Sequence, residues 1–158
     1  MPVVENVFAD GWDQEQAQPG YTWKRKFLGR RLGGELIGAT VLELPPGEKS
    51  FPYHWHHANE ELLVVLEGSP TLRSPKGERE LAPGDAVLFR RGPDGAHQLR
   101  NDAGAAASVL IVSTLIEPEV AEYPDSGKIG TVSGPVDART LRRFFRAGDD
   151  VDYFDGES

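Results

Sequence analysis

From residue 21 onward, the chain alternates short runs typical of strands with residues that favour turns. Nine runs of this kind are bounded by Gly, Pro or Asn: YTWKRKFLG, ELIGATVLEL, SFPYHWH, ELLVVLEG, TLRS, EREL, DAVLF, AHQLRN and SVLIVSTLI. Runs this short and this often interrupted are typical of strands rather than of helices. The pattern therefore predicts an all-β sandwich or barrel.

Some of the predicted strands are apolar on both faces. In residues 61–67, the two-residue strand period places Leu63 and Val65 on one face and other leucine and valine side chains on the opposite face. Residues 109–112 have the same property. Such strands need cover on both sides, which a second sheet, a terminal arm or another subunit can supply.

The two ends of the chain depart from the strand pattern. Residues 1–20 are polar and are predicted to form an N-terminal arm, followed by the barrel at 21–118 and a C-terminal extension at 119–158. In this extension, Asp137 is predicted to cap a short helix that ends at Phe145. The helix is expected because Leu141, Phe144 and Phe145 are spaced for a single apolar face.

The same segment contains a cluster of arginines: Arg139, Arg142, Arg143 and Arg146. Five acidic residues follow it between positions 149 and 158. We expect the cluster to form a solvated helix face that the acidic end partly neutralises. Anion binding is the alternative.

Composition narrows the class of protein. The chain has 158 residues and a formal net charge of −8, which argues against a nucleic-acid partner because phosphate backbones are bound by Lys and Arg. With no cysteine, it can form neither a disulfide nor a thiolate metal site. It starts without the basic and apolar regions of a secretory signal, and no run approaches the 18 apolar residues of a membrane span. A cytoplasmic protein with no membrane partner is expected.

The four histidines suggest the chemistry. On a strand, His54 and His56 point to the same face, Glu61 follows after a short break, and His97 opens a later strand. Three neutral imidazoles and one carboxylate suit a divalent transition metal with positions left open for water or substrate. Glu60 competes with Glu61, but Glu61 shares its face with inward-facing apolar residues. His57 points the other way and is expected at a surface or an interface.

Two motifs built on these residues resemble those of the cupin superfamily. The first cupin motif, G-x5-H-x-H-x3,4-E-x6-G, is matched with one extra residue before the first histidine by Gly47, His54, His56, Glu61 and Gly68. The second, G-x5-P-x-G-x2-H-x3-N, is matched by Gly84, Gly92, His97 and Asn101. In this second motif Arg90 replaces the usual proline, and two extra residues precede His97 within GPDG.

The resemblance implies a double-stranded β-helix, or jelly-roll barrel, that binds one divalent ion of Mn, Fe, Ni, Zn or Cu. The implied ligands are His54, His56, Glu61 and His97. It also implies a small-molecule ligand in the barrel and favours a homodimer over the other ways of covering two-faced strands. Cupins include dioxygenases, isomerases and lyases that act on small polar metabolites. The alternative is a non-catalytic module that binds or senses a small molecule.

The sequence contains few candidates for catalytic side chains. Arg90 and Arg91 lie beside His97 in the sequence, and Tyr53 is a weaker acid–base candidate. Ordinary charges at the barrel rim are the alternative for the two arginines. Phe51, Tyr53 and Trp55 are expected to face away from the ligands and to pack between sheets or subunits.

Overall fold

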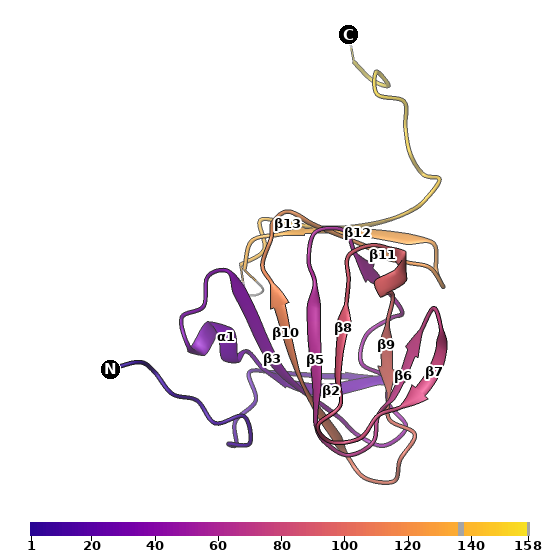
Figure 1. Ribbon diagram of the computed structural model, residues 1–158. Coiled ribbons are helices and arrows are strands. Elements are labelled where there is room, and N and C mark those ends of the chain that lie inside the picture. Colours follow the sequence, from indigo (N-terminus) through magenta and orange to yellow (C-terminus); the bar gives the residue numbers. More distant parts are fainter. Residues whose placement is uncertain (136–137, 158) are drawn as a thin grey trace.

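A computed structural model describes residues 1–135 and 138–157, which form mostly antiparallel strands (Figure 1). The largest sheet contains β1 (Gln14–Gln18), β2 (Tyr21–Lys26), β3 (Ile37–Leu44), β10 (Ala107–Thr114), β5 (Glu61–Glu67) and β8 (Ala86–Phe89), in that order. A second sheet contains β13 (Leu141–Arg146), β12 (Lys128–Ser133), β11 (Glu119–Tyr123) and β4 (Trp55–His56). A third contains β7 (Gly77–Glu80), β6 (Thr71–Ser74) and β9 (Gln98–Arg100).

Within residues 1–135 and 138–157, helical structure is confined to two short segments. Helix α1 spans Leu28–Arg31, and the 3-10 helix η1 spans Pro93–Gly95. Among the described residues, no helix has the length and apolar character needed to cross a bilayer.

All nine predicted runs contain a strand, β2 to β10, so the all-β prediction is confirmed. Their inward side chains form one core, in which Leu42 and Leu44 of β3 are fully buried beside Leu63 and Val65 of β5. Burying apolar side chains of this size stabilises a fold by about 1.5–3 kcal/mol each, which makes this core the main source of stability.

The N-terminal residues contribute more than an arm. Strand β1 pairs with β2 along its whole length, so the predicted boundary at residue 20 falls inside a β-hairpin. Before it, the backbone carbonyls of Val7 and Ala9 accept hydrogen bonds from Nζ of Lys26, at 2.7 and 2.5 Å. These bonds give the buried ammonium group of Lys26 two hydrogen-bond acceptors, and they attach the first residues to the sheet.

The predicted C-terminal helix is wrong. Leu141–Arg146 forms strand β13, which pairs with β12 over six residues; Asp137, the predicted cap, lies outside the described residues. The Phe144 ring occupies the space above Gly130, where an added Cβ would lie 2.6 Å from Cε1 of that ring. Tertiary pairing with β12 therefore overrides the helical spacing of the apolar residues.

The outer face of the large sheet remains partly apolar. Leu62 and Leu88 lie opposite each other on β5 and β8, and their exposed fractions are 40% and 54%. The homodimer stays a prediction, which sedimentation equilibrium of the wild type and of Leu88→Glu can test.

Candidate metal centre

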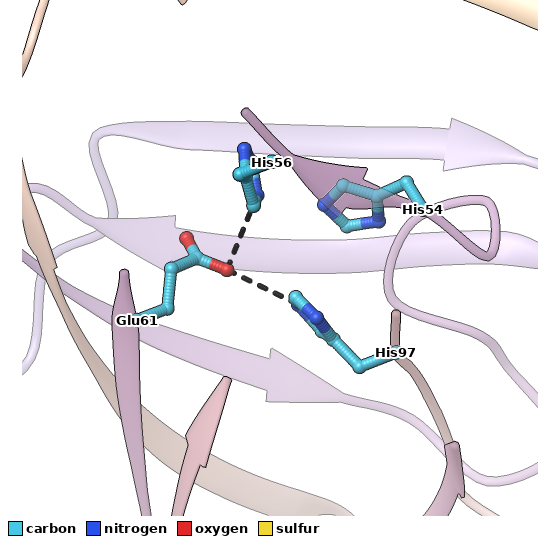
Figure 2. Close-up of side chains that lie close together, drawn as sticks. All are labelled: His54, His56, Glu61 and His97. Atoms are coloured by element: carbon cyan, nitrogen blue, oxygen red, sulfur yellow. Dashed lines mark ion pairs between the residues drawn. The ribbon is translucent and has the colours of Figure 1, made fainter. Parts of the chain in front are cut away.

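Four side chains from separate segments converge in the interior (Figure 2). His54 and His56 come from the segment around β4, Glu61 from the start of β5, and His97 from the residue before β9. Each offers one ligand atom, and these atoms all lie within 4.8 Å of one another. Oε2 of Glu61 is 3.4 Å from Nε2 of His56 and 3.1 Å from Nε2 of His97. The structure thus brings together the four ligands that the sequence predicts.

Two of the rings are oriented by backbone carbonyls. Nδ1 of His54 lies 2.8 Å from the carbonyl oxygen of Pro52, and Nδ1 of His97 lies 2.9 Å from that of Gly95. A carbonyl can only accept, so each Nδ1 carries a proton and each Nε2 is left to face the cluster. This arrangement is typical of histidines that bind a metal through Nε2.

The third ring, His56, faces carboxylates instead. Its Nε2 faces Glu61, and its Nδ1 lies 3.7 Å from Oε2 of Glu119. Neither nitrogen forms a hydrogen bond, although both are buried. Leaving two buried nitrogens without a hydrogen bond is costly, and a cation bound to Nε2 would remove part of that cost. The orphaned nitrogens and the N₃O donor set therefore fit a divalent transition metal.

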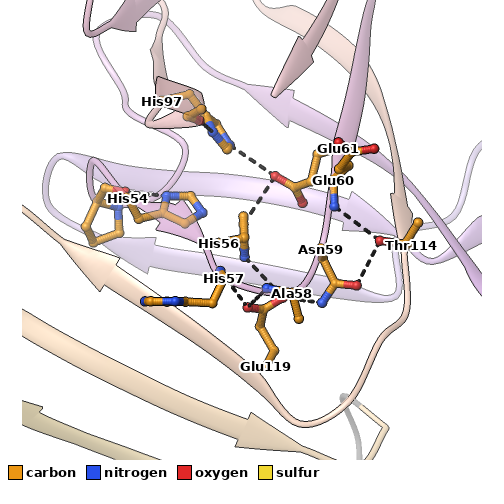
Figure 3. Close-up of polar contacts among 12 residues, drawn as sticks. His54, His56, His57, Ala58, Asn59, Glu60, Glu61, His97, Thr114 and Glu119 are labelled. Atoms are coloured by element: carbon orange, nitrogen blue, oxygen red, sulfur yellow. Dashed lines mark hydrogen bonds and ion pairs between the residues drawn. The ribbon is translucent and has the colours of Figure 1, made fainter. Parts of the chain in front are cut away.

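Glu119 is held by its own network (Figure 3). The backbone amides of His57 and Ala58 both donate to its Oε1 at 3.2 Å, and the Asn59 side chain donates to its Oε2. Asn59 is fixed in turn, because its Oδ1 accepts hydrogen bonds from the Thr114 hydroxyl and from another backbone amide. No pattern in the sequence points to Glu119, which reaches His56 only through the pairing of β11 with β4.

Burial and mutual contact set the charges of the cluster. Burial lowers the pKa of His54 to about 3, and the neighbouring imidazoles act in the same direction, so this ring is neutral. Burial alone would lower the pKa of His56, but Glu119 and Glu61 outweigh it and raise that pKa to about 9. Burial would raise the pKa of Glu61, but His56 and His97 hold it far below the ordinary value.

The four side chains line a cavity of about 1110 Å³. Its volume is slightly above the range of about 300–1,000 Å³ that is typical of small-molecule sites. Tyr123 of β11 lines it and stacks on His54, with ring centres 5.8 Å apart. Phe89 stacks on His97 at 3.8 Å. Phe51 also lines the cavity, contrary to the expected stripe, because residues 51–54 do not form a regular strand with a two-residue period.

The remaining candidates lie elsewhere. Tyr53 does not line the cavity; it is buried beneath the guanidinium of Arg73, whose Cζ is 4.0 Å from the ring centre. Arg90 and Arg91 line a separate surface depression of about 450 Å³. The two extra residues in GPDG are taken up by η1, which packs Gly95 against the carbonyl of Arg90. His97 therefore keeps its place in the cluster.

Glu60, which competes with Glu61 in the sequence, and His57 are also outside the cavity lining. Glu60 is exposed and lies at the depression, as does His57. His57 is a surface residue, as expected, and its Nε2 lies 2.9 Å from Oε1 of Glu122.

Residues 40–113 match the family model of the cupin domain, and this segment contains all four clustered residues. The chain therefore contains a cupin domain. The likeness of this cupin to solved structures extends beyond that segment, but no curated protein sequence matches it.

Two similar structures are of proteins named as sugar phosphate isomerases. One, provisionally so named, is from Acidithiobacillus ferrooxidans; it is 28% identical, with a TM-score of 0.75 over 84% of this cupin and 81% of that chain. The other, from Silicibacter pomeroyi, is 29% identical, with a TM-score of 0.72 over 80% of this cupin and 78% of that chain. A polyketide cyclase from Streptomyces resistomycificus is 27% identical, with a TM-score of 0.53 over 61% of this cupin and 68% of that chain.

Proposed function

We propose that this cupin is a metal-dependent isomerase that interconverts the aldose and ketose forms of a small sugar phosphate. The observation that carries the proposal is the His54, His56, Glu61 and His97 cluster at a cavity large enough for such a substrate. The two similar structures named as sugar phosphate isomerases support the choice of reaction among those known for cupins.

The four clustered residues would hold the metal ion, which supplies a Lewis acid that polarises a carbonyl or hydroxyl oxygen of the substrate. The chain supplies the surroundings. Burial raises the pKa of Tyr123, so its phenol stays protonated at neutral pH and can donate a hydrogen bond to a substrate oxygen. Phe89 covers one face of His97 and excludes water there. Glu119 holds the orientation of His56 rather than contacting substrate, because its own oxygens are occupied.

The experiment is an isomerase assay in D₂O. Protein loaded separately with Mn, Fe, Ni or Zn is incubated with a panel of aldose and ketose phosphates, and NMR measures both the product and deuterium uptake beside the carbonyl. We expect turnover in the wild type and none in His54→Ala, with His57→Ala as the matched control. Absence of turnover and of deuterium uptake with every metal and sugar phosphate would overturn the proposal.

The assay also separates the other cupin activities. Oxygen consumption that depends on substrate would indicate a dioxygenase, and products with fewer carbon atoms would indicate a lyase. Saturable binding with no reaction would indicate a binding or sensing module.

A further inference from the structure

One cation of the cavity has no carboxylate partner. Arg25, on β2, lines the cavity, and among the described residues no Asp or Glu forms an ion pair with it. Other arginines of this chain are paired: Arg31 with Asp13 at 2.9 Å, and Arg73 with Asp125 at 2.6 Å. No acidic side chain that the structure describes therefore neutralises the charge of Arg25.

The position of the Arg25 guanidinium is nevertheless well defined. Its Cζ lies 4.8 Å from the ring centre of Trp23 and 4.7 Å from that of Phe27, so the aromatic rings hold the cation without neutralising it. Its Nε and Nη2 donate to Oε1 of Gln14 at 2.8 and 2.5 Å. A guanidinium has five N–H groups, and these bonds to a neutral amide leave three for a ligand.

A second cation faces the same region. Burial lowers the pKa of Arg25 to about 10, and the positive charge of Arg139 acts in the same direction. Arg139 also lines the cavity, where its guanidinium donates to the carbonyl of Gly134. Glu117 also lines the cavity, but its Oε2 already accepts hydrogen bonds from the Ser133 hydroxyl and the Gly134 amide. Two neighbouring positive charges repel each other, and an anion bound beside them would offset that repulsion.

The Arg25 guanidinium lies a short way from the four clustered side chains. Cζ of Arg25 is 5.9 Å from the ring centre of Phe51, which is in turn 6.4 Å from the ring centre of His54. The phenyl ring of Phe51 therefore lies between the Arg25 guanidinium and the His54 imidazole. A molecule of a few carbon atoms, with an oxyanion at one end and a carbonyl at the other, can reach both.

We propose that Arg25 and Arg139 form an oxyanion subsite that binds the phosphate, or a carboxylate, of the substrate while its other end reaches the His–Glu cluster. The inference rests on the proposed function for the role of the cluster, but binding of an anion at Arg25 does not require catalysis. A planar guanidinium matches two oxygens of such a group, which makes Arg25 the selective element.

The test is calorimetric titration of the protein as purified with inorganic phosphate at constant ionic strength, and in parallel with acetate. We expect Arg25→Met to weaken binding of the preferred anion by at least about tenfold. Arg73→Met is the matched control, because Arg73 also lies over an aromatic ring but outside the cavity. Preference for phosphate identifies a phosphate ester, and preference for acetate identifies a sugar acid.

Two further variants keep the result interpretable. If Arg25→Met does not fold, Arg25→Lys keeps the charge without the planar fork and should still weaken binding of the anion. His54→Ala should lose isomerase activity while retaining anion binding, which separates failure of the subsite from failure of the proposed function. Wild-type protein that binds neither anion, or equal affinity in the wild type and the folded Arg25 variant, would overturn the subsite.

Discussion

The carboxylate of Glu119 lies 3.7 Å from Nδ1 of His56, while Nε2 of the same ring faces Glu61. His56 thus receives from a side chain the orienting contact that His54 and His97 receive from backbone carbonyls. All three rings turn Nδ1 toward an oxygen outside the cluster. Orienting contacts of this kind fix the tautomer and the direction of a ligand.

Replacing this carboxylate should weaken metal binding. We expect Glu119→Gln to lower metal affinity by about 10–100-fold, because an amide group then faces both His56 and the Asn59 donor. Competition with a fluorescent chelator measures the affinity. Glu122→Gln, on the same strand but bonded to the exposed His57, is the control and should bind metal as the wild type does. Equal affinity in the two variants would contradict a positioning role.

Removing a ligand should have a larger effect. His54→Ala and Glu61→Ala should each lose most of the bound metal, and the stabilisation that the metal gives the holo protein should be lost with it. Elemental analysis and thermal melting with and without chelator measure the two effects. His57→Ala should change neither, since its ring is on the surface. An unchanged ratio of metal to protein after both ligand substitutions would exclude these residues as ligands.

Metal binding should also depend on pH in a defined direction. The pKa of His56 is raised to about 9 in the metal-free cluster, so this ring is protonated at neutral pH and must lose its proton to bind a metal. Affinity should therefore rise by about tenfold per pH unit up to pH 9 and level off above it. Chelator competition from pH 6.5 to 9.5 checks the slope. A flat profile would mean that His56 is already neutral before metal binds.

Substitutions at the contact between Phe144 and Gly130 test the packing of β13 on β12. Gly130→Ala places a methyl group where the Phe144 ring lies, and we expect a loss of about 1–3 kcal/mol in the free energy of unfolding. The double variant Gly130→Ala with Phe144→Ala should lose less than the two single changes added together, because the clash is gone. Additive losses, measured by urea denaturation, would contradict the packing of β13 on β12.

Sequence alone predicts the strands and the four residues of the cluster well, for physical reasons. Residues 61–67 and 107–114 are apolar and bounded by turn residues, and the spacing of His54, His56 and Glu61 is local. The elements that the sequence does not predict are those that form only by pairing with another strand. Gln14–Gln18 is entirely polar apart from one alanine and becomes a strand only by pairing with β2.

The C-terminal segment illustrates the same limit. Leu141–Arg146 fits a helical period as well as a strand, and only pairing with β12 decides between them. That outcome also changes the role of its arginines, since Arg142 lines the cavity instead of a solvated helix face. The contact of Glu119 with His56 and the position of Arg25 opposite Gln14 are likewise set by strand register, for which single residues carry no pattern.

The segment that matches the cupin domain spans residues 40–113, so Arg25 and Arg139 of the proposed subsite both come from the flanks of that segment. Anion selectivity at the proposed subsite and the set of four clustered side chains are thereby encoded in different stretches of the gene. Mutations in the flanks can alter which molecules are admitted without touching a single donor atom, and the two properties are free to diverge separately during evolution.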